Sequence, residues 1–508
     1  MLGLDHIVRL IRVAIVLIRY DALAPREYQE RLPIPLRIVA QVLRVFARRR
    51  RPKSPGARLA MALEKLGPAY VKLGQFLATR PDIIGVTAAQ DLGRLKDRLP
   101  AFPRDRALDT INEELGATET LFGNISEALA AASIAQVHMS VHPRNGVVAV
   151  KVLRPRIEKK LRREMAALHF GARLIEFFSV RSRRLEPVQF VDTVATALER
   201  ELDLRLEAGA AAEFRDVAAK DGFLAVPEID WSRSSKRVLT QTWVEGISLT
   251  DSTALDRAGA DRPALALAVT RGFLAAALDY GFFHADMHEG NLIYGKDGKL
   301  WVVDFGIMGR IGRKERRYLA EILYGFLRRD YRRVAEVHQE AGYVPEKFTV
   351  EEFAQALRAI GEPIFGKTAD EVSMSRLLLQ LFDVTHLFGM HLRPELVLLQ
   401  KTMVQVEGVA RALDPKHDMW GAARPIVERW VKRELGAEGV GRRVMDEASG
   451  GFAALRRLPQ TLAALEGAAE EIRRGPPPAE RARFQWMSFF VGFAVGGLLV
   501  FIAYYAGL

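Results

Sequence analysis

Four polar residues in a fixed order constrain the fold of this chain more than any other feature of its sequence. Lys151 ends the apolar run "VAVK", Asp286 and Asn291 lie five positions apart in "FFHADMHEGN", and Asp304 opens "DFG". A lysine can pair with phosphate oxygens, a carboxylate can accept the proton of a hydroxyl, and amide and carboxylate oxygens are ligands that suit Mg²⁺. The set therefore predicts a fold that brings these groups to a nucleotide phosphate.

The two histidines beside Asp286 admit a different interpretation. His284 and His288 are both potential metal ligands, but a zinc site needs a third ligand and none is obvious in the sequence. We therefore expect His284 to pack and to hydrogen-bond in a way that fixes the loop.

The strands and helices predicted around these residues follow the order of a two-lobed, kinase-like α+β fold. Two strand-like runs flank a Pro-Arg-Asn-Gly turn within residues 130–155 and predict a β-hairpin. A long helical stretch follows over about residues 157–220, then the strand-like "RVLTQTWVEG", then a mostly helical part with short strands near 292–294 and 300–303. In protein kinases, the lysine of the hairpin pairs with nucleotide phosphates and with a glutamate on the next helix. Lys151 occupies the place of that lysine.

An alanine-rich segment precedes the "VAVK" strand where kinases carry a glycine-rich loop. The run "AAASIAQV", residues 130–137, has the register of G-x-G-x-x-G-x-V, with Ala130, Ala132 and Ala135 at the glycine places. Alanine lacks the freedom of glycine at positive φ. We therefore expect a stiffer loop that approaches the phosphates differently, and slow turnover.

The segment after Asp304 lacks the activation segment of protein kinases, which ends in Ala-Pro-Glu. Within about ten residues of "DFGIMGRIG" the chain enters the helical pattern "RKERRYLAEILYGFLRRDYRRVAEVH". The surface that binds a peptide substrate in protein kinases is therefore expected to be missing.

The C-terminal residues 484–508, "FQWMSFFVGFAVGGLLVFIAYYAGL", contain no charged residue. A helix of this length can cross a bilayer, and Trp486, Tyr504 and Tyr505 resemble interfacial anchors. Arg481 and Arg483 precede the run, so the rest of the chain is expected on the cytoplasmic side. The alternative is a buried core helix.

The N-terminal residues 1–53 carry most of the excess positive charge. They contain 12 Lys/Arg and 4 Asp/Glu, a net of +8 out of +12 for the chain. Arg9, Arg12 and Arg19 share one face of an otherwise apolar helical pattern, which suits a membrane surface. An ordinary surface helix with its apolar side in the core is an equal alternative. The absence of cysteine excludes disulfides and thiolate chemistry.

Three further motifs resemble those of the UbiB family of atypical kinases, which is associated with ubiquinone biosynthesis. "KLGQ" at residues 72–75 matches the family's KxGQ motif, the alanine-rich loop ends in "SIAQVH", and Glu201-Leu202-Asp203 matches its ExD motif. Glu207 stands where the lysine-pairing glutamate of the family lies. The resemblance covers about residues 30–420 and extends to the C-terminal apolar run, although many members have two such helices and this chain shows one. Glu289 stands where proline is common.

The resemblance implies a specific arrangement and activity. The KxGQ helix would fold across the active site, with Lys72 and Gln75 facing the nucleotide and Lys72 near Glu201. Members look like ATPases, or phosphotransferases for small molecules or lipids, that support polyprenyl-phenol modification rather than phosphorylate proteins in trans. Without the resemblance, the sequence would predict that Lys72 is an exposed lysine on a helix and that the acidic residues of 201–207 lie on a solvated helix face. The spacing of Glu201, Asp203 and Glu207 prevents all three from sharing one partner.

These observations together predict a bilobal kinase-like α+β fold with a helical N-terminal extension and a C-terminal transmembrane helix. The expected parts are a basic arm (1–53), the extension with KxGQ (54–120), an N-lobe (121–247), a C-lobe (248–440), a linker (441–483) and the anchor (484–508).

The expected activity is that of a Mg·ATP enzyme on the cytoplasmic face of a bacterial inner membrane. ATP is expected between the lobes, with adenine on the backbone of a hinge at residues 243–245. Asp286 and Lys151 are the predicted catalytic residues and Asn291 and Asp304 the predicted metal ligands. The residues predicted to bind ATP are Ala130, Ala131, Ala132, Ser133, Ile134, Ala135, Gln136, Val137, Lys151, Glu207, Trp243, Val244, Glu245, Lys72, Gln75, Glu201 and Asp203.

The expected partners are membrane lipids, polyprenyl-phenol precursors and other proteins of ubiquinone biosynthesis, but no nucleic acid. Two other classes of function fit the same residues. One is a phosphotransferase for a small molecule, because "HADMHEGN" also resembles the loop of antibiotic and choline kinases. The other is a non-catalytic, nucleotide-gated scaffold for a biosynthetic complex.

Overall fold

The computed structural model describes residues 2–22, 41–42, 44–47, 52, 54–78, 84–93, 95, 100–116, 118–142, 146–178, 183, 186–345, 347–364, 384, 387–389 and 394–435. The chain divides into two units. The first comprises the described residues up to Glu213 and the segment Pro227–Val244, and the second comprises Phe214–Val226 and the described residues from Glu245 on. The predicted transmembrane run, residues 484–508, lies outside the described residues.

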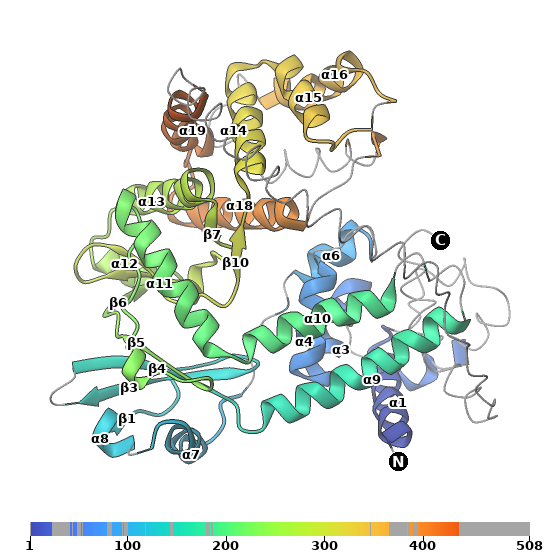
Figure 1. Ribbon diagram of the computed structural model, residues 1–508, viewed down its shortest axis with the longest axis vertical. Helices are drawn as coiled ribbons and strands as arrows, with labels where there is room; N and C mark the ends of the chain where they lie inside the picture. The colour runs from blue at the N-terminus through green and yellow to red at the C-terminus, as the bar shows by residue number, and fades with distance from the viewer. Residues whose placement is uncertain are drawn as a thin grey trace, which may run out of the picture. The chain divides into compact units, whose positions relative to one another are not determined.

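The first unit contains an antiparallel sheet (Figure 1). Its strand order is β1-β3-β4-β5, with β2 paired to β3. The predicted hairpin is confirmed as β3 and β4, in which Val137 lies opposite Lys151. One face of the sheet is packed by alternate valines of β4 against Ile111 and Phe122. The strands are β1 (Asn124–Ile125), β2 (Ala130–Ala131), β3 (Ala135–His142), β4 (Gly146–Leu153) and β5 (Val238–Thr242).

The helices of the first unit divide the predicted helical stretch 157–220 into three. Pro187 begins the second of these helices, where its fixed φ and missing N–H suit the first turn. The third follows after Leu202, and its first residue, Leu204, donates its N–H to the carbonyl of Lys236. The helices are α1 (Leu2–Arg19), α3 (Pro55–Leu66), α4 (Pro68–Ala78), α6 (Val86–Leu92), α7 (Arg104–Leu115), α8 (Thr118–Phe122), α9 (Ile157–Phe178), α10 (Pro187–Glu201) and α11 (Leu204–Asp221), whose residues from Phe214 on belong to the second unit.

Helix α1 packs against α9 and α3, as Figure 1 also shows for α9. Leu10, Val13 and Leu17 are buried, so one side of the helix belongs to the core. Val8, Ile11 and Ile15, by contrast, are about half exposed, with relative exposures of 58%, 43% and 50%. The helix therefore has an inner apolar face and a second apolar stripe that faces solvent.

The second unit is mainly helical and holds two small antiparallel sheets, β7 with β10 and β6-β8-β9. The predicted short strands near 292–294 and 300–303 are confirmed as β8 and β9. Its elements are β6 (Gly246–Ser248), α12 (Ser252–Arg257), α13 (Arg262–Ala275), η5 (Ala276–Tyr280), β7 (Phe282–His284), η6 (Glu289–Asn291), β8 (Leu292–Gly295), β9 (Leu300–Val302), β10 (Met308–Arg310), α14 (Arg313–Arg328), α15 (Tyr331–Glu340), α16 (Val350–Gly361), α18 (Pro394–Leu413) and α19 (Met419–Leu435).

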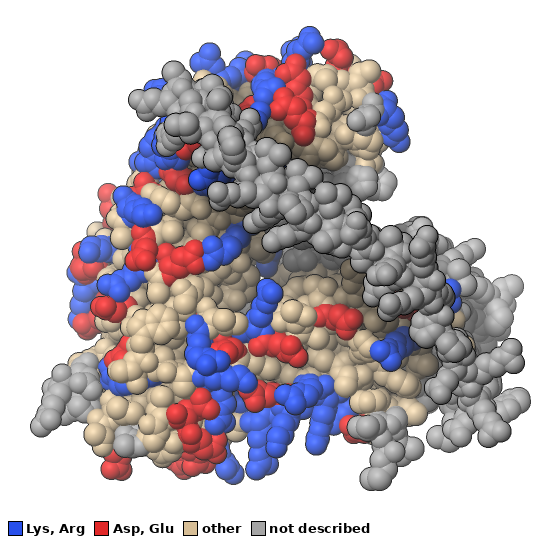
Figure 2. All heavy atoms as spheres, in the orientation of Figure 1, with Lys and Arg blue, Asp and Glu red and all other residues tan. Residues whose placement is uncertain are grey.

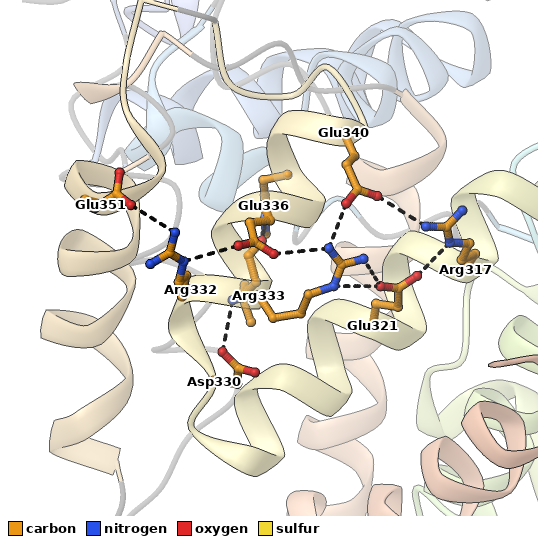
Figure 3. Close-up of polar contacts among 10 residues, drawn as sticks. Arg317, Glu321, Asp330, Arg332, Arg333, Glu336, Glu340 and Glu351 are labelled. Atoms are coloured by element: carbon orange, nitrogen blue, oxygen red, sulfur yellow. Dashed lines mark hydrogen bonds and ion pairs between the residues drawn. The ribbon is translucent and has the colours of Figure 1, made fainter. Parts of the chain in front are cut away.

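A network of ion pairs joins α14, α15 and α16 (Figure 3). Glu321 of α14 is buried and forms ion pairs with Arg317 at 2.6 Å and with Arg333 at 2.5 Å. Arg333 of α15 also contacts Glu340 at 2.7 Å, and Arg332 reaches Glu351 of α16 at 3.4 Å. Because Glu321 is paired from two sides, its burial leaves no uncompensated charge.

Within the described part of the chain, no helix combines the length and the apolar character that crossing a membrane requires.

Candidate active site

The loop after β7 holds the predicted catalytic carboxylate. His284, the last residue of β7, is buried, and its Nδ1 accepts the backbone N–H of Asp286 at 3.1 Å. The Nε2–H of the same ring donates to the backbone carbonyl of Asp304. Burial lowers the pKa of His284, which favours the neutral ring that this pair of hydrogen bonds requires. The expectation that His284 fixes the loop is confirmed.

The two predicted metal ligands are brought together by the β8–β9 hairpin. Asn291 immediately precedes β8, and the N–H of Val303 donates to its backbone carbonyl at 3.1 Å. Asp304 follows Val303. The side chain of Asn291 donates from Nδ2 to the carbonyl of Asp286 at 3.1 Å, so its Oδ1 is the atom left for a cation. Asp304 Oδ1 accepts the N–H of Gly306 at 3.1 Å.

Aromatic contacts hold the Asp-Phe-Gly segment in place. The buried ring of Phe305 lies 5.8 Å from the ring of His284 and 6.0 Å from that of Phe214. Phe214 also lies 6.4 Å from His284, so the three rings pack against one another. Asp304 is thereby attached to a rigid apolar cluster.

The first unit pairs each predicted lysine with a different glutamate. Lys151 Nζ lies 2.6 Å from Glu207 Oε1 on α11. Lys72 on α4 is 6% exposed, and its Nζ lies 2.9 Å from Glu201 Oε2 at the end of α10. Asp203 instead contacts Arg205, two residues along, at 2.6 Å. The three acidic residues therefore have three partners, and the structure does not bring Asp203 to either lysine.

The alanine-rich loop joins β2 to β3, and Arg154 braces it. Arg154 donates through its guanidinium to the carbonyl of Ala132 at 2.8 Å, and its N–H donates to the carbonyl of Ile134 at 2.8 Å. Ser133 is buried, and its hydroxyl has no hydrogen-bond partner among the described residues. Ala130 and Ala131 form β2, while Ala135 and Val137 belong to β3.

The side chain of Gln136 serves the fold. It is buried, its Oε1 accepts the N–H of Phe102 at 2.9 Å, and its Nε2 contacts the carbonyl of Phe102 at 3.2 Å and His138 at 2.8 Å. Burial lowers the pKa of His138. Both ends of the Gln136 amide are therefore satisfied within the first unit.

At the predicted hinge, two backbone groups already have partners. The N–H of Trp243 donates to Val147 at 3.2 Å, and the carbonyl of Glu245 accepts from Lys296 at 3.0 Å. The described residues offer the backbone of Val244 no hydrogen-bond partner.

Gln75 and the segment after Asp304 complete the predicted set. Gln75 is half-buried on α4, one turn from Lys72. The neighbouring Gly74 lies so close to Leu63 and Leu95 that a Cβ would be 2.7 and 2.5 Å from their side chains, which explains the glycine.

Helix α14 begins at Arg313, so the early return to helix after Asp-Phe-Gly is confirmed.

The donor set suits magnesium better than zinc. Mg²⁺ is commonly held by one or two protein oxygens together with phosphates and water, and Asn291 and Asp304 supply two such oxygens. In the part of the chain that the structure describes, no three His, Asp or Glu residues gather as a metal site. The residues present therefore fit Mg²⁺ bound together with a nucleotide.

Sequence reasoning missed one residue that contacts the predicted catalytic carboxylate. Gln405 on α18 donates from Nε2 to Oδ1 of Asp286 at 3.0 Å. Its 119-residue separation from Asp286 and its ordinary helical context leave no local signal that could have identified it.

Comparisons with known proteins show which family this chain resembles. A model of the ABC1 atypical kinase-like domain matches residues 94–338, and a model of the UbiB helical domain matches residues 357–418. A protein named "Probable protein kinase UbiB" from Marinobacter nauticus is 39% identical over 85% of this chain and 80% of its own. One of the same name from Aeromonas salmonicida is 38% identical over 89% of this chain and 84% of its own.

A solved structure shares the fold. It is titled as the complex of Rv3197 with erythromycin from Mycobacterium tuberculosis, and it covers 77% of this chain and 98% of its own with a TM-score of 0.50 and 21% identity.

Proposed function

The chain belongs to the UbiB family of atypical kinase-like proteins, and from that premise we propose that it is a Mg·ATP-dependent ATPase that supports ubiquinone biosynthesis at a membrane. The observation that carries the proposal lies in the second unit, where Asn291 donates to the carbonyl of Asp286 and His284 contacts both the N–H of Asp286 and the carbonyl of Asp304. Three oxygen-bearing side chains fixed in this way supply what phosphoryl transfer asks of a protein.

Each residue of this set receives a role from its chemistry. Asp286 accepts the proton of the attacking water while the water oxygen bonds to the γ-phosphorus. The bond from that phosphorus to the bridging oxygen breaks, and ADP leaves with the electron pair. Lys151 binds the phosphates, and Glu207 at 2.6 Å holds its ammonium in place. Asn291 and Asp304 would hold Mg²⁺, which would neutralise phosphate charge when bound.

The alanine-rich loop and the hinge complete the proposed nucleotide site. Arg154 fixes the carbonyls of Ala132 and Ile134, so the loop is braced rather than free to close over phosphates as a glycine-rich loop would be. We assign adenine recognition to the backbone of Val244, since Trp243 and Glu245 already use one backbone group each. The braced loop supports slow turnover.

The segment after Asp-Phe-Gly supports a substrate other than a protein. Only eight residues separate Asp304 from Arg313, the first residue of α14, which leaves no room for a peptide-binding segment. The buried Lys72–Glu201 pair fixes α4 to α10, as a helix that covers a site would require. We therefore propose water, rather than a protein hydroxyl, as the acceptor.

Two features of the first unit support a lipid partner. Val8, Ile11 and Ile15 form an exposed apolar stripe on α1, flanked by the exposed Arg12 and Arg19. Figure 2 shows further Lys and Arg side chains gathered over the start of α9, the helix on which α1 packs. An apolar stripe beside basic side chains suits an anionic lipid surface. Residues 484–508 would add a transmembrane anchor.

The proposed activity is tested by ATP hydrolysis of the purified full chain with and without anionic liposomes and a phenolic lipid precursor. We expect Mg-dependent release of phosphate that increases with both additions. No hydrolysis under any condition would favour the scaffold. Transfer of phosphate to an added compound instead of water would favour the phosphotransferase.

A further inference from the structure

The carboxylate of Asp286 contacts a helix that belongs to the family-specific part of the chain. Gln405 lies on α18, within the residues that match the UbiB helical domain. Helix α18 packs against α13 and β10, and β10 pairs with β7, the strand that leads into the Asp286 loop. The position of Gln405 relative to Asp286 is therefore set by direct packing within the second unit.

The hydrogen bond from Gln405 distinguishes the two oxygens of the Asp286 carboxylate. Oδ1 accepts Gln405 Nε2 at 3.0 Å. Oδ2 lies 3.7 Å from His288 Nε2, beyond hydrogen-bond distance, and the side chain of Asp286 is 28% exposed. Oδ2 is therefore the oxygen left for the proton of a nucleophile, and the amide of Gln405 fixes the rotation of the carboxylate that presents it.

The other end of the Gln405 amide makes no competing hydrogen bond among the described residues. Its Oε1 is buried and has no hydrogen-bond partner among the described residues. The reverse orientation would put Oε1 against the carboxylate oxygen and would be repulsive. Among the described residues, the amide is therefore held by its bond to Asp286 alone.

We propose that Gln405 is a positioning residue that orients the carboxylate of Asp286 for phosphoryl transfer, so that the UbiB helical domain contributes directly to the catalytic loop. The inference deepens the proposed ATPase function and rests on it for its catalytic consequence. Gln405 has no need to touch the nucleotide, so its loss should lower kcat and leave the KM for ATP almost unchanged.

The test is a double-mutant cycle with Gln405→Leu, Asp286→Ala and the double variant of the full chain. Gln405→Leu is expected to lower kcat about ten- to a hundredfold, the scale of one hydrogen bond to a charged group, with KM for ATP within about twofold. In the Asp286→Ala background it should lower kcat no further. Gln400→Leu is the matched control, because Gln400 lies on the same helix and its buried Oε1 likewise has no partner in the described part of the chain.

The same four proteins give a second cycle that does not depend on activity. If Gln405 holds Asp286, the unfolding constant of the double variant in urea should differ by about fivefold or more from the value expected when the effects of the two single substitutions are multiplied. The inference would be overturned if the two substitutions changed the unfolding constant independently of each other. It would also be overturned if Gln405→Leu still lowered kcat in the absence of Asp286. If the wild-type chain hydrolyses no ATP while the unfolding cycle is non-additive, the proposed function fails and the positioning of the carboxylate stands.

Discussion

Lys72 lies on α4 with its ammonium 2.9 Å from Glu201, and both side chains are largely buried, at 7% and 15% exposure. A lysine in such a place loses its hydration and is tolerated only because a carboxylate pairs with it. The local sequence would place this residue on an exposed helix face, and only the family motif indicated otherwise. The role of the pair in nucleotide binding stays a prediction, but its contribution to stability follows from the contact itself.

We predict that Lys72→Met lowers the free energy of unfolding by about 3 kcal/mol, because it leaves the carboxylate of Glu201 buried without this partner. Lys72→Met combined with Glu201→Leu should recover most of the loss. Lys65→Met, at an exposed position on the preceding helix, is the control and should change stability by less than about 0.5 kcal/mol. Urea denaturation measures all three, and equal effects at Lys65 and Lys72 would contradict the prediction.

The residues proposed to carry the phosphate chemistry could be proposed from the sequence because each lies in a short motif whose spacing is itself the signal. Asp286 and Asn291 belong to one loop, and Asp304 follows the hairpin that starts at Asn291. The pairing of Asp203 with Arg205 and the burial of Gln136 could not be predicted, since both depend on where side chains point after folding. Gln405 was missed because its contact joins distant parts of the chain.

At the scale of elements, strands and short helices followed the predicted pattern where turns mark their ends. The β3–β4 hairpin is such a case, while the 157–220 stretch concealed two breaks because its apolar periodicity continues on either side of them. The contacts between helices were beyond prediction. The network around Glu321 is an example, because it depends on three helices meeting (Figure 3).

We predict that Glu321→Gln destabilises the chain by about 2 kcal/mol at neutral pH, because charged hydrogen bonds to Arg317 and Arg333 are lost. Burial alone would raise the pKa of Glu321, but the hydrogen bonds and the positive charges of Arg317 and Arg333 together outweigh it, and the pKa lies below its usual 4.5. The stabilisation is therefore complete above that value and is lost as the pH falls through the lower, folded-state pKa.

The control for Glu321 is Glu351→Gln in the same network. Glu351 is 67% exposed, so its pair with Arg332 should contribute little, within about 0.5 kcal/mol. Thermal or urea unfolding at pH 7 and at pH 3 distinguishes the two positions. A wild-type advantage over Glu321→Gln that stays constant down to pH 3 would refute the assignment.

His338 of α15 gives a second pH dependence. Burial lowers its pKa to about 4, from 6.5, and its ring packs 5.2 Å from that of Phe353. The unfolded chain therefore binds a proton between pH 6.5 and 4 that the folded chain does not. The contribution of neutral His338 to the free energy of unfolding is therefore complete above pH 6.5, and about 3 kcal/mol of it is lost as the pH falls toward 4.

Replacing the ring removes this titration, so His338→Leu should show a smaller loss of stability between pH 6.5 and 4 than the wild-type chain. The unfolding free energy measured at several pH values in that interval provides the comparison. Parallel curves for the two proteins would show that His338 does not contribute.

Across the whole molecule, two segments suggest contact with lipid, and their contributions to membrane binding can be measured separately. We predict that deleting residues 484–508 releases most of the protein from membranes, and that the remaining binding to anionic liposomes falls with salt. Replacing Val8, Ile11 and Ile15 by serine should then abolish the remainder. Serine at Val141 and Val147, which are also exposed valines of the first unit, is the control. Liposome flotation gives the readout, and unchanged flotation of the truncated serine variant would contradict the prediction.

The family, the kinase-like fold and the hydrogen bonds of the Asp286 loop together lead us to propose that Asp304 holds Mg²⁺ for a bound nucleotide. The most direct measurement is the affinity for ATP, with and without Mg²⁺, of the wild-type chain, Asp304→Asn and the control Asp297→Asn, whose residue lies in the same hairpin and pairs with Lys299 and Trp301. We predict that Mg-dependent binding is lost in Asp304→Asn and retained in Asp297→Asn. An unchanged Mg·ATP affinity in Asp304→Asn would show that Asp304 does not hold the metal ion.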